Sequence, residues 1–184
     1  MKKVLLPVAL ACAAFLTGCA GYTWGTSVPK EYRKVSVPVF ENLTNVSELG
    51  PIVTQYTLRE FQREGSFRIA RAEDAAIEVQ GVLRTTKRVA VDYDRGRGMR
   101  ASEYRYAVLA DVSFVDKKNG KILFERKGIE GETTFLTQDD FLTGQNNASF
   151  RVVSDIARQI VNDAIALPLS GNGIRSGAVE GVQK

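Results

Sequence analysis

The segment from Ala76 to Tyr93 alternates apolar and polar residues, and it constrains the fold more than any other part of the chain. Successive side chains of a β-strand point to opposite faces of a sheet, so this pattern predicts a long strand with one wet face. The apolar face is expected to hold Ile77, Val79, Leu83, Val89, Val91 and Tyr93. The wet face is expected to hold Glu78, Gln80, Arg84, Arg88 and Asp92.

A second alternating segment, residues 104–116, predicts another long strand with one apolar face. The following residues 116–120 end in Asn119-Gly120, a pair that favours a tight hairpin turn. We therefore expect residues 121–129 to return as an antiparallel strand.

Two segments have the spacing of amphipathic helices. The first spans residues 47–64, with Ser47 as its cap, Pro51 in its first turn and Gly65 as its stop. The second spans residues 146–166 and ends before Pro168. Its apolar stripe consists of Phe150, Val153, Ala157, Ile160, Val161 and Ala164.

The order of these elements predicts one α/β domain over residues 33–167. A strand at 35–40, a helix and a short strand at 67–70 imply a crossover that makes the two strands parallel. Helices with a single apolar stripe are best buried together against one sheet face. We therefore expect an α+β fold, a two-layer sandwich in the outline β-α-β-β-β-α, with two helices on one face of a mixed sheet and the other face exposed.

The N-terminal residues are typical of a bacterial lipoprotein signal. Lys2 and Lys3 precede an apolar run over residues 4–16, which is too short to span a bilayer, and Leu16-Thr-Gly-Cys19 follows. We expect residues 1–18 to be a signal peptide, Cys19 to carry the fatty acids (palmitate among them), and residues 19–32 to be a lipid-anchored tether. Residues 168–184 are expected to be a disordered tail.

The residue after the lipid-carrying cysteine indicates the membrane. An Asp at that position commonly retains a lipoprotein at the inner membrane, whereas this chain has Ala20. We therefore predict an anchor in the cell outer membrane, on its periplasmic side. Because Cys12 leaves with the signal peptide and Cys19 is acylated, we expect no disulfide.

The composition argues against an enzyme. The chain has no histidine, and after processing it would have no free cysteine, so the commonest general base and the commonest transition-metal ligands are absent. No spacing suggests a carboxylate or Ser–Lys site. We expect neither catalysis nor a bound metal or other cofactor.

Residues 84–105 form a basic segment, with seven basic side chains against three acidic ones. A local excess of positive charge predicts an anionic partner, and for an exported protein a lipid headgroup or phosphorylated glycolipid is favoured over nucleic acid. The candidate binding residues are Arg84, Lys87, Arg88 and Arg105. The alternative is a solvated strand and loop of ordinary arginine content, and the pattern alone does not separate the two.

Three motifs resemble a known family: Cys19-Ala-Gly-Tyr22, Val35-Ser-Val-Pro-Val-Phe-Glu-Asn42 and Ala72-Glu-Asp-Ala-Ala-Ile-Glu-Val-Gln-Gly81. Together they resemble LptE, the lipopolysaccharide-assembly lipoprotein of the outer-membrane lipopolysaccharide translocon. The resemblance implies a small α/β lipoprotein that plugs a β-barrel partner, assists its assembly and binds lipopolysaccharide on its way to the cell surface.

Two other functions fit the same motifs. Strands of this type also occur in lipoproteins that activate cell-wall synthases or form secretion pores, and fold alone does not decide function. An orphan periplasmic lipoprotein is the third possibility. Co-purification with a large barrel, with a synthase or as a homo-oligomeric ring would distinguish them.

Overall fold

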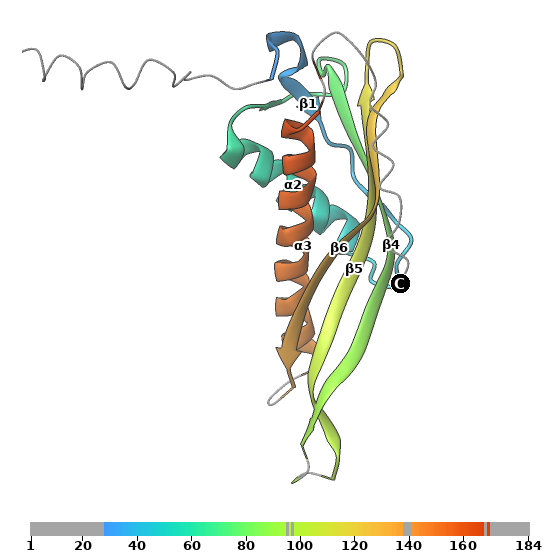
Figure 1. Ribbon diagram of the computed structural model, residues 1–184, viewed down its shortest axis with the longest axis vertical. Helices are drawn as coiled ribbons and strands as arrows, with labels where there is room; N and C mark the ends of the chain where they lie inside the picture. The colour runs from blue at the N-terminus through green and yellow to red at the C-terminus, as the bar shows by residue number, and fades with distance from the viewer. Residues whose placement is uncertain (1–27, 95, 97, 138–140, 168, 170–184) are drawn as a thin grey trace, which may run out of the picture.

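The computed structural model describes residues 28–94, 96, 98–137, 141–167 and 169. Within them a short 3-10 helix, η2 (Lys30–Tyr32), precedes two α-helices and six strands (Figure 1). These are β1 (Lys34–Ser36), β2 (Glu41–Asn42), α2 (Leu49–Glu64), β3 (Arg68–Ile69), β4 (Ile77–Asp94), β5 (Arg100–Asp116), β6 (Ile122–Leu136) and α3 (Phe141–Ile165).

The strands form one open, mixed sheet in the order β3-β1-β4-β5-β6. β1 runs parallel to β3 and β4, which confirms the predicted parallel pairing, and β2 pairs with β4 farther along the same edge. β4, β5 and β6 are antiparallel. The turn between β5 and β6 is the predicted one, with Gly120 at φ 69° and the Asp116 amide donating to the Lys121 carbonyl.

Both helices lie on the same face of the sheet, as predicted (Figure 1). The core between the layers is apolar: Val53 and Phe61 of α2, Ile156 and Ile160 of α3, and Phe114 of β5 are all fully buried. Each such side chain contributes roughly 1.5–3 kcal/mol relative to an exposed position. The α+β two-layer sandwich is therefore confirmed, and burial between helices and sheet holds it together.

Several element boundaries differ from the sequence-based prediction. The first strand divides into β1 and β2 around Pro38, which cannot donate to a ladder. β3 and β4 are separate strands, as the ranges 67–70 and 76–93 predicted, so the division at Pro38 gives six strands in the described chain where five strand ranges were expected. β6 continues seven residues beyond 129, and α3 begins at Phe141 instead of 146.

A glycine explains how β6 continues beneath α3. A Cβ atom at Gly131 would lie 2.7 Å from the Val152 carbonyl oxygen and 2.9 Å from Cγ1 of Ile156. Only a residue without a side chain allows the helix this close to the strand. Gly131 therefore sets the contact distance between α3 and β6.

The helix ends follow the sequence only in part. α2 stops at Gly65, as predicted, where a left-handed φ of 84° lets the amide donate to the Phe61 carbonyl. The predicted cap at Ser47 is wrong, because Glu48 is the N-cap and makes no side-chain capping bond. Phe150 is also not in the core: its ring stacks on Tyr56 near the surface.

The predicted signal peptide 1–18, Cys19, most of the tether 19–32 and most of the tail 168–184 lie outside the described residues. The described chain begins with a buried Val28 followed by η2. Among the helices that the structure describes, none is long and apolar enough to cross a membrane.

Candidate functional site

A bulge in β4 decides which residues of the basic segment share a face. Leu83 lies opposite Ala110 and Thr85 opposite Leu109, so Arg84 has no cross-strand partner. An extra residue reverses the alternation of the strand beyond it. Arg88 therefore lies opposite the buried Tyr106, on the face that carries the helices. The prediction that Arg84 and Arg88 share one wet face is wrong, because it assumed uninterrupted alternation.

The predicted apolar face of β4 is wrong beyond this bulge, where two further register shifts follow between Ala90 and Asp92 and between Asp92 and Tyr93. Ile77, Val79 and Leu83 are buried, but Val89, Val91 and Tyr93 are 59%, 41% and 49% exposed. The distal part of the β4–β5 hairpin also extends past the first turn of α3, where neither helix covers it (Figure 1). This end of the sheet therefore exposes apolar side chains beside its cations.

Arg84 is held by an ion pair on the central strand. Its Nε donates to Oδ2 of Asp111 at 2.7 Å, and Oδ1 of Asp111 accepts the Gly128 amide at 2.9 Å. Burial alone would raise the pKa of Asp111. The Gly128 hydrogen bond, the Arg84 hydrogen bond and the charges of Arg84 and Lys127 outweigh it, so the pKa lies below its usual value.

Arg88 is held by α3. Its guanidinium lies over the Phe141 ring, 4.8 Å from the centroid, and its Nη1 donates to Oε1 of Gln145 at 2.7 Å. These contacts join the hairpin to the first turns of the helix. Arg88 thus already has partners within the fold.

Lys87 and Arg105 lie together on the uncovered face. Lys87 is opposite Ala107 and Val89 is opposite Arg105, so the two cations are diagonal neighbours, whose Cα atoms are typically about 7–8 Å apart. Both side chains are exposed, and neither has an ion-pair or hydrogen-bond partner among the residues that the structure describes.

Carboxylates and apolar side chains surround this pair. Cross-strand pairing puts Glu132 beside Ala107 and Leu136 beside Glu103 on the same face. Leu136 is 55% exposed. We call Lys87, Val89, Arg105 and Leu136 the outer hairpin surface. The sequence placed Lys87 and Arg105 among the candidates, but it gave no signal for Val89, because nothing in residues 83–85 announces the bulge.

No group of three or more His, Cys, Asp or Glu side chains that could hold a metal ion occurs in the described part of the chain. The side chains of the outer hairpin surface can pair with charges and make apolar contacts. Such a surface offers contacts to an anionic amphiphile.

Comparison with known families decides the identity. The model of the LptE family, described as lipopolysaccharide-assembly, matches residues 32–164. The chain belongs to this family. LptE proteins are non-catalytic lipoproteins of the outer membrane in lipopolysaccharide transport. The resemblance read from the sequence is thereby confirmed, and the chain is a lipopolysaccharide-assembly lipoprotein.

Several solved structures are similar to the chain at low identity, and one of them, with a TM-score above 0.5, shares its fold. A hypothetical protein from Chlamydia trachomatis is 10% identical with a TM-score of 0.53, covering 73% of this chain and 96% of that one. The rare lipoprotein B from Shewanella oneidensis is 16% identical with a TM-score of 0.47, covering 72% and 94%. A PelC dodecamer from Paraburkholderia phytofirmans is 19% identical with a TM-score of 0.40, covering 72% and 94%. No curated protein matches the sequence significantly.

Proposed function

We propose that this LptE-family protein plugs a lipopolysaccharide-translocating β-barrel of the outer membrane, assists its assembly and helps insert lipopolysaccharide at the cell surface. Lipids on Cys19 would anchor it on the periplasmic side. Family membership supports the lipopolysaccharide role. The sheet face that neither helix covers (Figure 1) carries charged side chains, Lys87 and Arg105 among them, and such a face fits the polar interior of a barrel.

The outer hairpin surface is the observation that carries the glycolipid part of the proposal. Lipopolysaccharide presents phosphates beside acyl chains. Arg105 can pair with a phosphate by two parallel hydrogen bonds, Lys87 adds a second charge, and exposed Val89 and Leu136 offer apolar contact. Arg84 and Arg88 remain candidates, but they would first have to leave Asp111 and Gln145.

Two double variants test this assignment. Lys87→Gln with Arg105→Gln should weaken binding of the purified protein to lipopolysaccharide about tenfold or more, and more at low salt than at high salt. Arg84→Gln with Arg88→Gln removes the same amount of positive charge, but from two residues that are already bound to Asp111 and Gln145. This variant should weaken lipopolysaccharide binding less. Equal losses in both variants, or no loss at low salt, would refute the outer hairpin surface as the site.

Co-purification from membranes tests the barrel role separately. We expect a large outer-membrane barrel to accompany the protein, and both double variants to retain it. Recovery of a cell-wall synthase, or of a homo-oligomeric ring alone, would favour the alternative functions and overturn the plug.

A further inference from the structure

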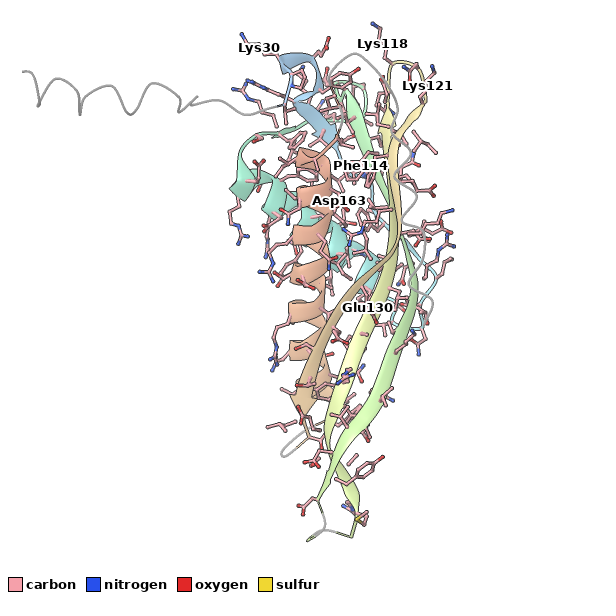
Figure 2. The ribbon with its side chains drawn as sticks, in the orientation of Figure 1. Lys30, Phe114, Lys118, Lys121, Glu130 and Asp163 are labelled. Carbon is pink, nitrogen blue, oxygen red and sulfur yellow. The ribbon has the colours of Figure 1, made fainter. Side chains whose placement is uncertain are left out.

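We propose that the end of the domain from which the chain leads back to Cys19 is a second, electrostatic membrane anchor that binds anionic phospholipid headgroups. The residues are Lys30, Lys118 and Lys121, called here the lysine end. Figure 2 shows all three at the same end of the molecule. The inference rests on the predicted lipid at Cys19, and it does not depend on the glycolipid site.

Three segments that are distant in sequence meet at the lysine end. The Lys117 amide donates to the Ala76 carbonyl, and the Ala76 amide donates to the Lys34 carbonyl, so the β5–β6 turn lies beside the start of β1. A hollow of about 710 Å³ is lined by residues of η2, of the 72–76 loop and of the same turn. The positions of Lys118 and Lys121 are therefore fixed relative to η2 by the fold.

The charges at this end are unbalanced. Residues 29–34, 71–76 and 116–121 together carry seven basic and four acidic side chains. Lys117 is paired with Glu78 at 2.9 Å, and the Asp116 carboxylate accepts the Lys118 amide and the Asn119 carboxamide within the turn. The ammonium groups of Lys30, Lys118 and Lys121 are exposed, and the described residues provide none of them with a partner.

The anchor brings this end within reach of the bilayer. Eight residues lie between Cys19 and Val28, and even a fully extended segment of these nine residue steps spans only about 30 Å. A lipid anchor combined with a basic patch holds a protein far better than one signal alone. An anionic leaflet attracts each nearby lysine by roughly fivefold in binding. The leaflet that holds the acyl chains is therefore the partner that this charge fits.

The test uses the chain from Ala20 onward, which keeps the whole described core between Val28 and Leu167 but lacks the lipids. Sedimentation with phosphatidylcholine vesicles, with and without phosphatidylglycerol, measures the partition coefficient. We expect binding only to the anionic vesicles at low salt. Lys30→Gln, Lys118→Gln and Lys121→Gln together should lower the coefficient about 100-fold.

A matched control removes three exposed cations from the body of the domain: Arg63→Gln, Lys127→Gln and Arg158→Gln. It should lower binding by less than about fivefold, the effect of roughly one lysine near the surface. Equal losses in the two triple variants would show that only total charge matters and would overturn the proposal. Absence of binding by the unmodified chain would overturn it too. Lipopolysaccharide binding is measured on the same lysine-end variant. If the lysine end fails as a membrane anchor while lipopolysaccharide still binds, only this inference is overturned and the proposed function stands.

Discussion

Asp111 joins Arg84 of β4 to Gly128 of β6 through one carboxylate, at 2.7 Å and 2.9 Å. Both neighbours of the central strand are irregular at this level, since β4 bulges at Arg84 and β6 shifts register between Arg126 and Ile129. The bulge in β4 in turn directs Lys87 to the uncovered face and Arg88 to α3. The carboxylate of Asp111 therefore stabilises the arrangement of the candidate site.

Stability should fall in acid partly through Asp111. Its pKa is lower in the folded chain than in the unfolded one, so its contribution is present above the unfolded value near 3.8 and is lost as the pH falls through the folded value. Urea titrations from pH 7 to pH 2 should show this loss. In Asp111→Asn the curve should be flatter below pH 4. An unchanged curve would contradict the assigned interaction.

Arg88 should matter for stability and Lys87 should not. Arg88→Gln loses the contact with the Phe141 ring and the hydrogen bond to Gln145, which together contribute about 1–2 kcal/mol. Hydrogen exchange in the first turns of α3 should also become faster. Lys87→Gln should change the unfolding free energy by less than about 0.5 kcal/mol. A larger loss of stability for Lys87→Gln than for Arg88→Gln would mean that the faces assigned to these two residues are exchanged.

Local sequence patterns predicted most of the fold, because each helix, strand or turn is determined largely by residues close together in the sequence. The alternation in residues 76–83, the Asn119-Gly120 turn and the stop at Gly65 each depend on a few neighbouring residues, and all three were read correctly. The two helices on one face followed because each has one apolar stripe.

The candidate site could not be predicted from local patterns, because it depends on strand register and on contacts between residues distant in the sequence. The bulge at Arg84 belongs to the pairing of β4 with β5, and the ion pair that holds Arg84 comes from Asp111, 27 residues away in the sequence. Beyond the bulge the sequence still alternates, but Val89 now lies on the exposed face and Arg88 on the face that carries the helices. Similarly, the sequence predicted a strand only to residue 129, whereas β6 continues through Gly131, where α3 packs closely over it. Charge located the basic segment, but only register decided that Lys87 and Arg105 share a face.

Gly131→Ala should be destabilising. The added methyl group would lie 2.7 Å from the Val152 carbonyl oxygen, so α3 must move away from β6, at a cost of about 1–3 kcal/mol. Gly96→Ala is the control, because its nearest neighbour is a movable Asp94 side-chain oxygen at 3.3 Å. Urea midpoints measure both. Equal small effects would show that the helix is not held at this distance.

Changing Cys19 to Ser should release the protein from membranes. The thiol at this position is the predicted acceptor of the lipid, and a hydroxyl does not replace it. Labelling with a radioactive fatty acid and fractionation of cell extracts measure the change. Cys12→Ser, which lies in the predicted signal peptide, should leave both readouts unaltered. Undiminished labelling of the Cys19 variant would refute the anchor.

The hydroxyl of Tyr106 should lower the stability of the fold. The residue is buried beneath α3, and the described part of the chain provides its oxygen with no hydrogen-bond partner of good geometry. Burial raises the pKa of Tyr106, against weaker opposing effects of Ser149 and Arg88. A buried polar group without a partner costs roughly 1–3 kcal/mol, so Tyr106→Phe should stabilise the fold by about 1 kcal/mol.

Thermal unfolding should register that change as a rise of roughly 2–8 °C in Tm. Tyr104→Phe is the matched control, since Tyr104 is only half-buried against Phe135 and Phe141 and should respond little. A fall in Tm for the Tyr106 variant would mean that its hydroxyl has a hydrogen-bond partner in solution, with Ser149 as the candidate. Ser149→Ala would then produce the same fall, and combining the two substitutions would add little to either one.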